Sequence, residues 1–126
     1  MSVRLAMLIM LSLMLLLACS SNSGDIDAVL SKAKAEGKIV MLELGSVGCS
    51  SCEQMKPVIQ KLRDAYPGKL EVIFVDVRED SRTGRKFRVI MMPTQVFLNK
   101  SGTEIHRHIG FYSYEEILPV LKKAGI

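Results

Sequence analysis

A single stretch near the middle of the chain constrains the fold most. The apolar run KIVMLEL at residues 38–44 lies between two glycines and is followed closely by the motif GCSSC. Such a continuous hydrophobic run is typical of a strand buried on both faces of a sheet. The apolar positions of residues 50–65 recur with helical spacing instead. The sequence therefore predicts a central strand, a short loop and a helix, with Cys49 and Cys52 at the start of that helix.

Similar patterns predict the other elements. These are a helix over 25–37, strands over 69–77, 94–99 and 104–110, a short helix between 78 and 89, and a last helix opened by a Ser113–Glu116 capping box. Pro57 should bend the second helix, and Pro119 should kink the last helix or delay its start. The order α-β-α-β-α-β-β-α predicts one α/β domain with parallel crossovers first, then a hairpin, and helices on both faces of the sheet.

The beginning of the chain has the pattern of an export signal. Arg4 is the only charge among the first 18 residues, and an apolar run follows it and ends at Ala18. The run is short for a membrane-spanning helix, which needs roughly 20 apolar residues. Leu16-Leu17-Ala18-Cys19 resembles the lipobox of bacterial lipoproteins. An ordinary cleaved signal or a retained anchor, with an incidental Cys19, is the alternative.

The lipobox resemblance implies cleavage before Cys19 and a lipid on its sulfur. The expected organisation is a lipoprotein signal peptide at 1–18, a lipidated tether at 19–24 and a folded domain at 25–126. We therefore expect an exported protein anchored by lipid to a bacterial membrane at its periplasmic face. Ser20, the residue after the cysteine, favours the outer membrane.

The charge pattern argues against nucleic acid as a partner. The net charge is only +4, and the charged residues are dispersed along the chain. One basic cluster is present and is interpreted as a solvated helix face; it comprises Arg82, Arg85, Lys86 and Arg88.

The cysteine pair has three interpretations. A structural staple is disfavoured because closing so short a loop stabilises little. A metal site needs more ligands than one CxxC provides. His106 and His108 are the only histidines and are expected to face solvent, whereas Met91 and Met92 would suit copper(I). No metal residue is assigned.

A reactive dithiol agrees best with the position of the pair. Unpaired N–H groups at a helix start favour a thiolate at Cys49. Cys52 lies one turn further along the same helix, within reach of a mixed disulfide formed at Cys49. This arrangement predicts an exposed nucleophile and a less exposed resolving thiol.

Four features together resemble the thioredoxin-fold family over residues 25–126. They are VGCSSC, the following Lys56-Pro57, the segment Met92-Pro93-Thr94, and Gly110 at the end of the last strand. The resemblance implies a four-stranded mixed sheet, with Pro93 cis beside the sulfurs. It also implies that Met92, Pro93 and Gly110 bind substrate, an extended peptide pairing with the backbone of Met92.

Glu43 interrupts the central apolar strand. A carboxylate buried there should have a raised pKa. Thioredoxins carry an aspartate at the matching position, and some membrane-tethered relatives in cytochrome c maturation carry glutamate. The resemblance thus assigns Glu43 as proton acceptor or donor for Cys52. The alternative is a polar strand-end residue that faces water.

The expected function is an extracytoplasmic, membrane-tethered thiol:disulfide oxidoreductase, a monomer that reduces protein disulfides without a cofactor or metal. A membrane-embedded thiol reductase would supply electrons, and the substrates stay open between apocytochrome c, other exported proteins with disulfides and an oxidoreductase partner. Ser50-Ser51 replaces the Gly-Pro of thioredoxin, so an oxidase or isomerase is an alternative. A copper(I)-binding or delivery protein is the alternative outside enzymes.

Overall fold

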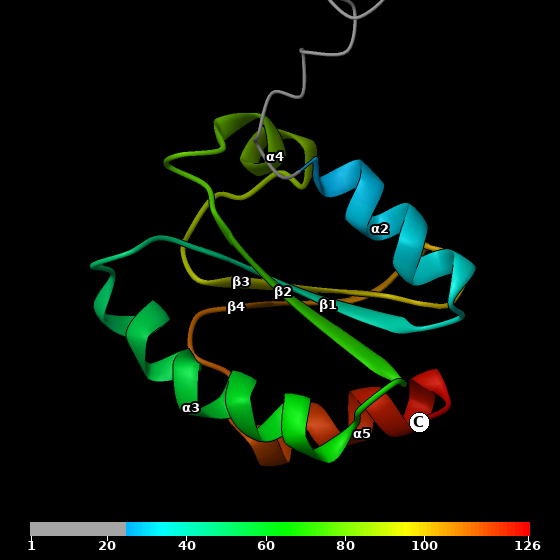
Figure 1. Cartoon of the computed structure of the whole chain (residues 1–126). Coiled ribbons are helices and arrows are strands. Elements are labelled where there is room, and N and C mark those ends of the chain that lie inside the picture. Colours follow the sequence, from blue (N-terminus) through cyan, green and yellow to red (C-terminus); the bar gives the residue numbers. More distant parts are fainter. Residues whose placement is uncertain (1–24) are drawn as a thin grey trace, which may run out of the picture.

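The fold is a four-stranded sheet with helices on both faces. It is seen in a computed structural model that describes residues 25–126, so the expected signal peptide, tether and Cys19 lie outside the described residues. The elements are α2 (Ile26–Ala35), β1 (Ile39–Gly45), α3 (Ser50–Ala65), β2 (Leu70–Asp76), α4 (Ser81–Lys86), β3 (Thr94–Leu98), β4 (Glu104–Ile109) and α5 (Tyr114–Ala124). In Figure 1, α2 and α4 lie on one side of the sheet, and α3 and α5 lie on the other. The expected α/β class and mixed sheet are confirmed.

The strand order is β2-β1-β3-β4. β1 pairs in parallel with β2, but β3 runs antiparallel to β1, and β4 is antiparallel to β3. The expectation of parallel crossovers is therefore wrong for β3. The reason is the length of α4: six residues span only about 9 Å, too short to return the chain along β2. The chain crosses to β3 near the end where β2 stops.

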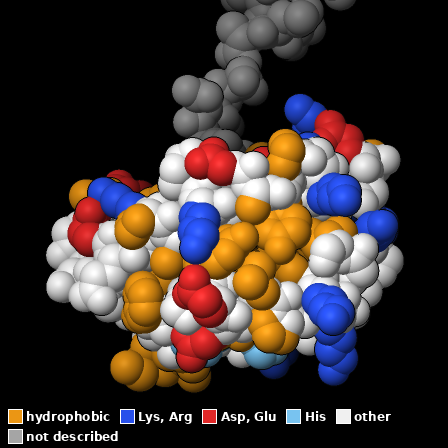
Figure 2. Space-filling model, turned by 90° about the horizontal axis from the view of Figure 1, so that it is seen from below, with side chains coloured by type: hydrophobic (Ala, Val, Ile, Leu, Met, Phe, Trp, Pro, Cys, Tyr) orange, Lys and Arg blue, Asp and Glu red, His pale blue; other side chains and the backbone are white. Residues whose placement is uncertain are grey.

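β1 is the central strand of the core, and all seven of its residues are buried. Because strand side chains alternate between faces, Ile39, Met41 and Glu43 share the face covered by α3 and α5. The other face of β1 packs against α2. Figure 2 views the molecule from the α3 and α5 side, where hydrophobic side chains are visible between charged ones. The two apolar layers hold β1 in place and thereby fix the end of the strand that leads to Cys49.

The last helix begins where its capping box predicts. Ser113 and Glu116 exchange both capping hydrogen bonds, and α5 continues past Pro119. The expected delay of the helix start is wrong, because the capped N–H groups of the first turn already have their partners. Within residues 25–126, no helix combines the length and the hydrophobicity that crossing a membrane requires.

Candidate active site

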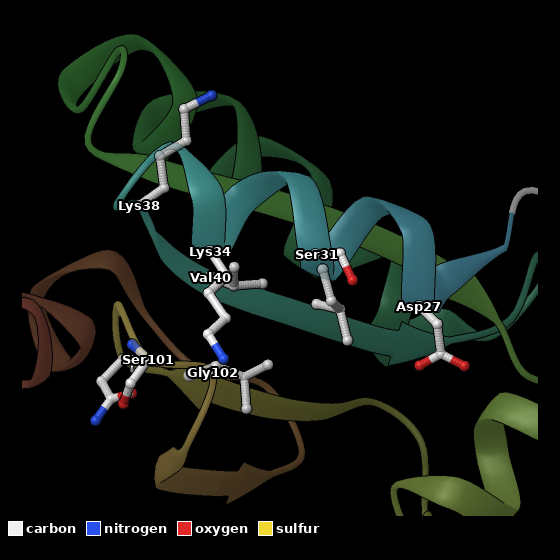
Figure 3. Close-up of a pocket in the computed structure, with 10 residues that line it drawn as sticks. Asp27, Ser31, Lys34, Lys38, Val40, Ser101 and Gly102 are labelled. Atoms are coloured by element: carbon white, nitrogen blue, oxygen red, sulfur yellow. Dashed lines mark hydrogen bonds between the residues drawn. The ribbon is translucent and has the colours of Figure 1, made fainter.

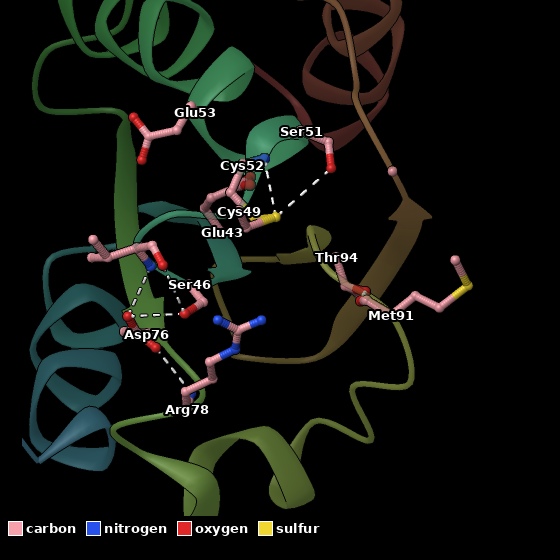
Figure 4. Close-up of a disulfide and its surroundings, with 12 residues drawn as sticks. Glu43, Ser46, Cys49, Ser51, Cys52, Glu53, Asp76, Arg78, Met91 and Thr94 are labelled. Atoms are coloured by element: carbon pink, nitrogen blue, oxygen red, sulfur yellow. Dashed lines mark hydrogen bonds between the residues drawn. A yellow bond between two sulfur atoms is a disulfide. The ribbon is translucent and has the colours of Figure 1, made fainter.

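A disulfide joins Cys49 and Cys52 at the junction of β1 and α3, with their Cα atoms 5.2 Å apart. Cys49 is the N-cap of α3, and its Sγ accepts a hydrogen bond from the backbone N–H of Cys52 at 3.4 Å. The Ser51 hydroxyl lies 3.7 Å from the same sulfur (Figure 4). The sulfur of Cys49 thus sits among the N–H groups of a helix start, where negative charge is stabilised.

The two cysteines differ in exposure. Cys49 is half-buried, whereas the side chain of Cys52 is only 5% exposed. A disulfide sulfur approaching from solvent can therefore reach Cys49 but not Cys52. This difference in exposure is the one expected between an attacking thiol and a resolving thiol.

Gly45 makes room for Cys52. A Cβ atom on Gly45 would lie 3.0 Å from the Cys52 Sγ, which is tighter than nine in ten real Cβ contacts. The last residue of β1 therefore lies directly against the inner sulfur. Sequence reasoning assigned no role to Gly45, although a glycine between a buried strand and a CxxC motif was a usable signal.

Glu43 lies two residues before Gly45 on the same face of β1, about 7 Å further along the strand. Its side chain is fully buried, which excludes a strand-end residue facing water. Burial raises the pKa of Glu43 from 4.5 to about 7, and a hydrogen bond from Gln95 opposes the rise. A carboxyl group whose pKa is about 7 therefore lies on the same face of β1 as Gly45, against which the Cys52 sulfur is placed.

Gln95 on β3 is the partner of Glu43 across the sheet and is also fully buried. Its Nε2 donates to Glu43 Oε1 at 3.4 Å and to the carbonyl of Gly110 at 3.1 Å. Sequence reasoning missed Gln95, although a polar residue inside the apolar strand TQVFL is the same kind of signal as Glu43. Its relation to Glu43 depends on strand register, which single-sequence patterns do not reveal.

The three predicted substrate-binding residues lie at one end of β3 and β4. The Met92–Pro93 peptide bond is cis. The backbone N–H of Gly110 donates to the carbonyl of Pro93 at 2.8 Å. Thr94 donates to the carbonyl of Met91 at 2.7 Å, and both are among the surroundings of the disulfide in Figure 4. Pro93 and Gly110 are thus brought together beside the Met92 backbone.

Asp76 anchors the loop that leads from β1 to Cys49. Its Oδ2 accepts from the N–H of Val47 at 2.9 Å and from the hydroxyl of Ser46 at 3.3 Å. Its Oδ1 accepts from the N–H groups of Arg78 and Glu79. These donors, the Val47 N–H first, hold the pKa of Asp76 below its ordinary value. Sequence reasoning assigned no role to Asp76, which parallel pairing places opposite Gly45.

Several exposed hydrophobic side chains flank these segments. They come before Cys49, on β2, before Pro93 and after Gly110, and we call them the apolar rim: Val47, Phe74, Ile90, Met91 and Phe111. Ile90 is 87% exposed and Val47 is 72% exposed. Exposed apolar side chains that adjoin the segments of a site are typical of a surface that binds a protein or peptide.

The histidines do not face solvent as the sequence suggested. His106 and His108 are half-buried, and both rings stack on the buried Tyr112. His106 Nε2 lies 3.1 Å from the Tyr112 hydroxyl. The alternation of the strand was correct, but α5 and the segment before it cover the face that carries these rings. Across residues 25–126, no group of three or more metal-ligating side chains is present.

A separate hollow lies between α2 and the β3–β4 turn (Figure 3). Its lining includes Lys38 and Val40, at the end of β1 far from Gly45. The hollow therefore makes no contribution to the disulfide site.

Comparisons with known proteins agree with this site. The family described as "thioredoxin-like domain" matches residues 26–125. A thioredoxin of Staphylococcus aureus is 29% identical over 91 residues, which are 72% of this chain and 86% of the relative.

Solved thioredoxins have the same fold. The structure of a poplar thioredoxin h superimposes with a TM-score of 0.68 at 26% identity, covering 79% of this chain and 88% of its own. A thioredoxin of Nicotiana alata gives 0.68 at 27% identity, covering 79% and 85%. The chain therefore belongs to the thioredoxin-like family, and with its Cys49–Cys52 disulfide it is a thiol:disulfide oxidoreductase.

Proposed function

We propose that the chain is a membrane-tethered reductase of disulfides in exported proteins. The observation that carries this proposal is the unequal exposure of the cysteine pair above a buried carboxyl group. Cys49 is open to solvent on one side, while Cys52 is 5% exposed and Glu43 is fully buried. This arrangement favours ordered attack by one thiol and proton transfer at the other.

In the first step the Cys49 thiolate attacks one sulfur of a substrate disulfide. A bond forms between Cys49 Sγ and that sulfur, the substrate S–S bond breaks, and the departing thiolate takes up a proton from solvent. The open N–H groups at the start of α3 stabilise charge on the attacking sulfur. The product is a mixed disulfide on Cys49.

In the second step the Glu43 carboxylate accepts the proton of the Cys52 thiol. The resulting thiolate attacks Cys49 Sγ, so that the Cys49–Cys52 bond forms and the second substrate sulfur leaves as a thiolate. That thiolate is protonated in turn, and Glu43 returns its proton to solvent. Two electrons have then passed to the substrate, and no cofactor or metal takes part.

The substrate is proposed to bind as an extended peptide along Met92, Pro93 and Gly110. The backbone of Met92 would pair with it in the manner of an added strand. The apolar rim would contact hydrophobic side chains that flank the substrate cysteine. Apocytochrome c and other exported proteins with disulfides both fit this description.

The direction of electron flow is tested by the reduction potential of the Cys49–Cys52 pair. Thioredoxins are reducing, with a potential of about −270 mV, whereas strong periplasmic oxidants lie near about −120 mV. We expect a value close to the reducing limit, with a membrane-embedded thiol reductase as donor. A value close to the oxidising limit would overturn the reductive direction and favour the oxidase or isomerase.

Substrates are identified with Cys52→Ser, which leaves Cys49 able to attack but unable to be released. Exported proteins should accumulate as mixed disulfides with this variant, and a Cys49→Ser/Cys52→Ser double variant is the matched control. Recovery of the same proteins with the control would show that capture is not through Cys49.

The membrane tether is proposed from the lipobox Leu16-Leu17-Ala18-Cys19. Labelled palmitate should be incorporated by the full chain expressed in bacteria and lost on Cys19→Ala. Label that persists in Cys19→Ala would contradict the anchor while leaving the redox proposal intact.

A further inference from the structure

Two buried oxygen atoms at the pairing of β1 with β3 have no hydrogen-bond partner among residues 25–126. They are Oε2 of Glu43 and Oε1 of Gln95, which belong to residues paired across β1 and β3. Both side chains are fully buried. A buried acceptor without a donor is costly, and two on adjacent partners call for a common explanation.

One proton on Glu43 would satisfy both oxygens. A neutral carboxyl group can donate from Oε2 to Gln95 Oε1 while its Oε1 accepts from Gln95 Nε2, the bond observed at 3.4 Å. We propose that Gln95 is a positioning residue that forms a two-bond acid–amide pair with protonated Glu43 and keeps the Nε2 bond alone when Glu43 is ionised. This inference rests on the proposed role of Glu43 in proton transfer.

The same amide also bonds to the backbone along which the substrate peptide is proposed to bind. The second hydrogen of Gln95 Nε2 is donated to the carbonyl of Gly110 at 3.1 Å. The N–H of Gly110 in turn donates to the carbonyl of Pro93 at 2.8 Å. Both hydrogens of one amide group therefore connect the proton acceptor to the backbone that would hold the peptide. An apolar side chain at this position could make neither contact.

Among residues 25–126, few groups near Glu43 could form hydrogen bonds with its carboxyl group in place of Gln95. On β2, the partner of Glu43 is the uncharged Phe74. On β4, the partner of Gln95 is His108, whose Nε2 is in contact with the carbonyl of Phe111. The remaining titratable groups nearby are on other elements and are committed elsewhere: Cys52 of α3 in the disulfide, Asp76 with the loop after β1, and Tyr112 with His106.

The first test uses the unaltered oxidised protein. Nuclear magnetic resonance should show the side-chain amide of Gln95 and the carboxyl carbon of Glu43 shifting together with pH, with one midpoint close to 7. The Gln95 transition should vanish in Glu43→Gln. Gln95 amide signals that stay constant while Glu43 titrates would overturn the inference without the use of any Gln95 variant.

The second test replaces the amide by an apolar side chain of similar length, Gln95→Met. Protonated Glu43 would lose two neutral hydrogen bonds, whereas ionised Glu43 would lose the one donor that residues 25–126 give to its buried charge. A buried charge without a donor costs more than neutral groups left unpaired. The midpoint of Glu43 should therefore rise by about one pH unit. The pH profile of mixed-disulfide resolution should move by the same amount. Val96→Ala, on the opposite face of β3, should move neither.

The outcomes separate this inference from the proposed function. If Glu43→Gln leaves resolution unchanged, the proton-transfer role of Glu43 fails. If Glu43→Gln slows resolution but Gln95→Met leaves both the midpoint and the profile unmoved, the role of Gln95 fails alone. If Gln95→Met shifts resolution equally in the Glu43→Gln background, Gln95 acts by another route and the inference is wrong.

Discussion

Gly45 and Cys52 are in such close contact that a side chain on Gly45 would force Cys52 to shift. A Cβ atom on Gly45 would lie 3.0 Å from Cys52 Sγ and 3.4 Å from Phe74 Cε2. Gly45→Ala should therefore destabilise the fold by about 1–3 kcal/mol through overpacking. Urea unfolding of the reduced protein measures the loss.

The sulfur is the origin of most of this cost. In a Cys52→Ala background the closest atom is removed, and the same Gly45→Ala change should cost much less. An equal cost in both backgrounds would show that the glycine is needed for another reason, such as its contact with Phe74.

Asp76 should control the order of the loop before Cys49. In Asp76→Asn one carboxylate oxygen becomes an NH2 group, which cannot accept a hydrogen bond. The two oxygens that accept from the Val47 and Arg78 N–H groups are thereby reduced to one. We expect faster hydrogen exchange at Val47 and slower attack by Cys49 on disulfides. Asp64→Asn, an exposed change on α3, is the control and should alter neither. Unchanged exchange at Val47 would contradict the anchoring role.

Glu43 should make the oxidised protein less stable as the pH rises. Its pKa is about 7 when folded and 4.5 as an ordinary glutamate. Between these values the folded state binds more protons than the unfolded state, so the free energy of unfolding falls with pH. The loss should begin near pH 4.5, reach about 3 kcal/mol by pH 7 and then stop.

Glu43→Gln separates this effect from other titrations, because glutamine does not titrate. Burial lowers the pKa of His106, which acts in the opposite direction by favouring the folded state as pH rises. The difference between the two proteins cancels that contribution. A difference that stays constant from pH 4.5 to 8 would show that the pKa of Glu43 is not raised in the folded protein.

Local patterns were sufficient for most of the fold. The apolar run of β1, the capping box at Ser113 and the hairpin of the strands predicted over 94–99 and 104–110 each appear where their sequence signals lie. The direction of β3 was missed, because it depends on α4 being too short to span the sheet. Such a limit on length appears only when the elements are assembled.

The residues of the site also fall into those that the sequence predicted and those that it did not. Cys49, Cys52 and Glu43 were visible as a motif and as a charge within an apolar strand. Gln95 and Asp76 were not assigned, because their importance comes from being opposite Glu43 and Gly45 in neighbouring strands. Register between strands is set by the whole core, so it cannot be read from any one segment.

The central claim is that Cys49 attacks and Cys52 resolves. It is tested most directly by mixing the reduced protein with an aromatic disulfide that releases one coloured thiolate at each attack. The equivalents of thiolate released per chain are then measured. The chain with Cys19→Ala should release two equivalents, the same chain with Cys52→Ser one, and with Cys49→Ser almost none on the same time scale. Rapid release by the Cys49→Ser chain, or a second equivalent from the Cys52→Ser chain, would contradict the account.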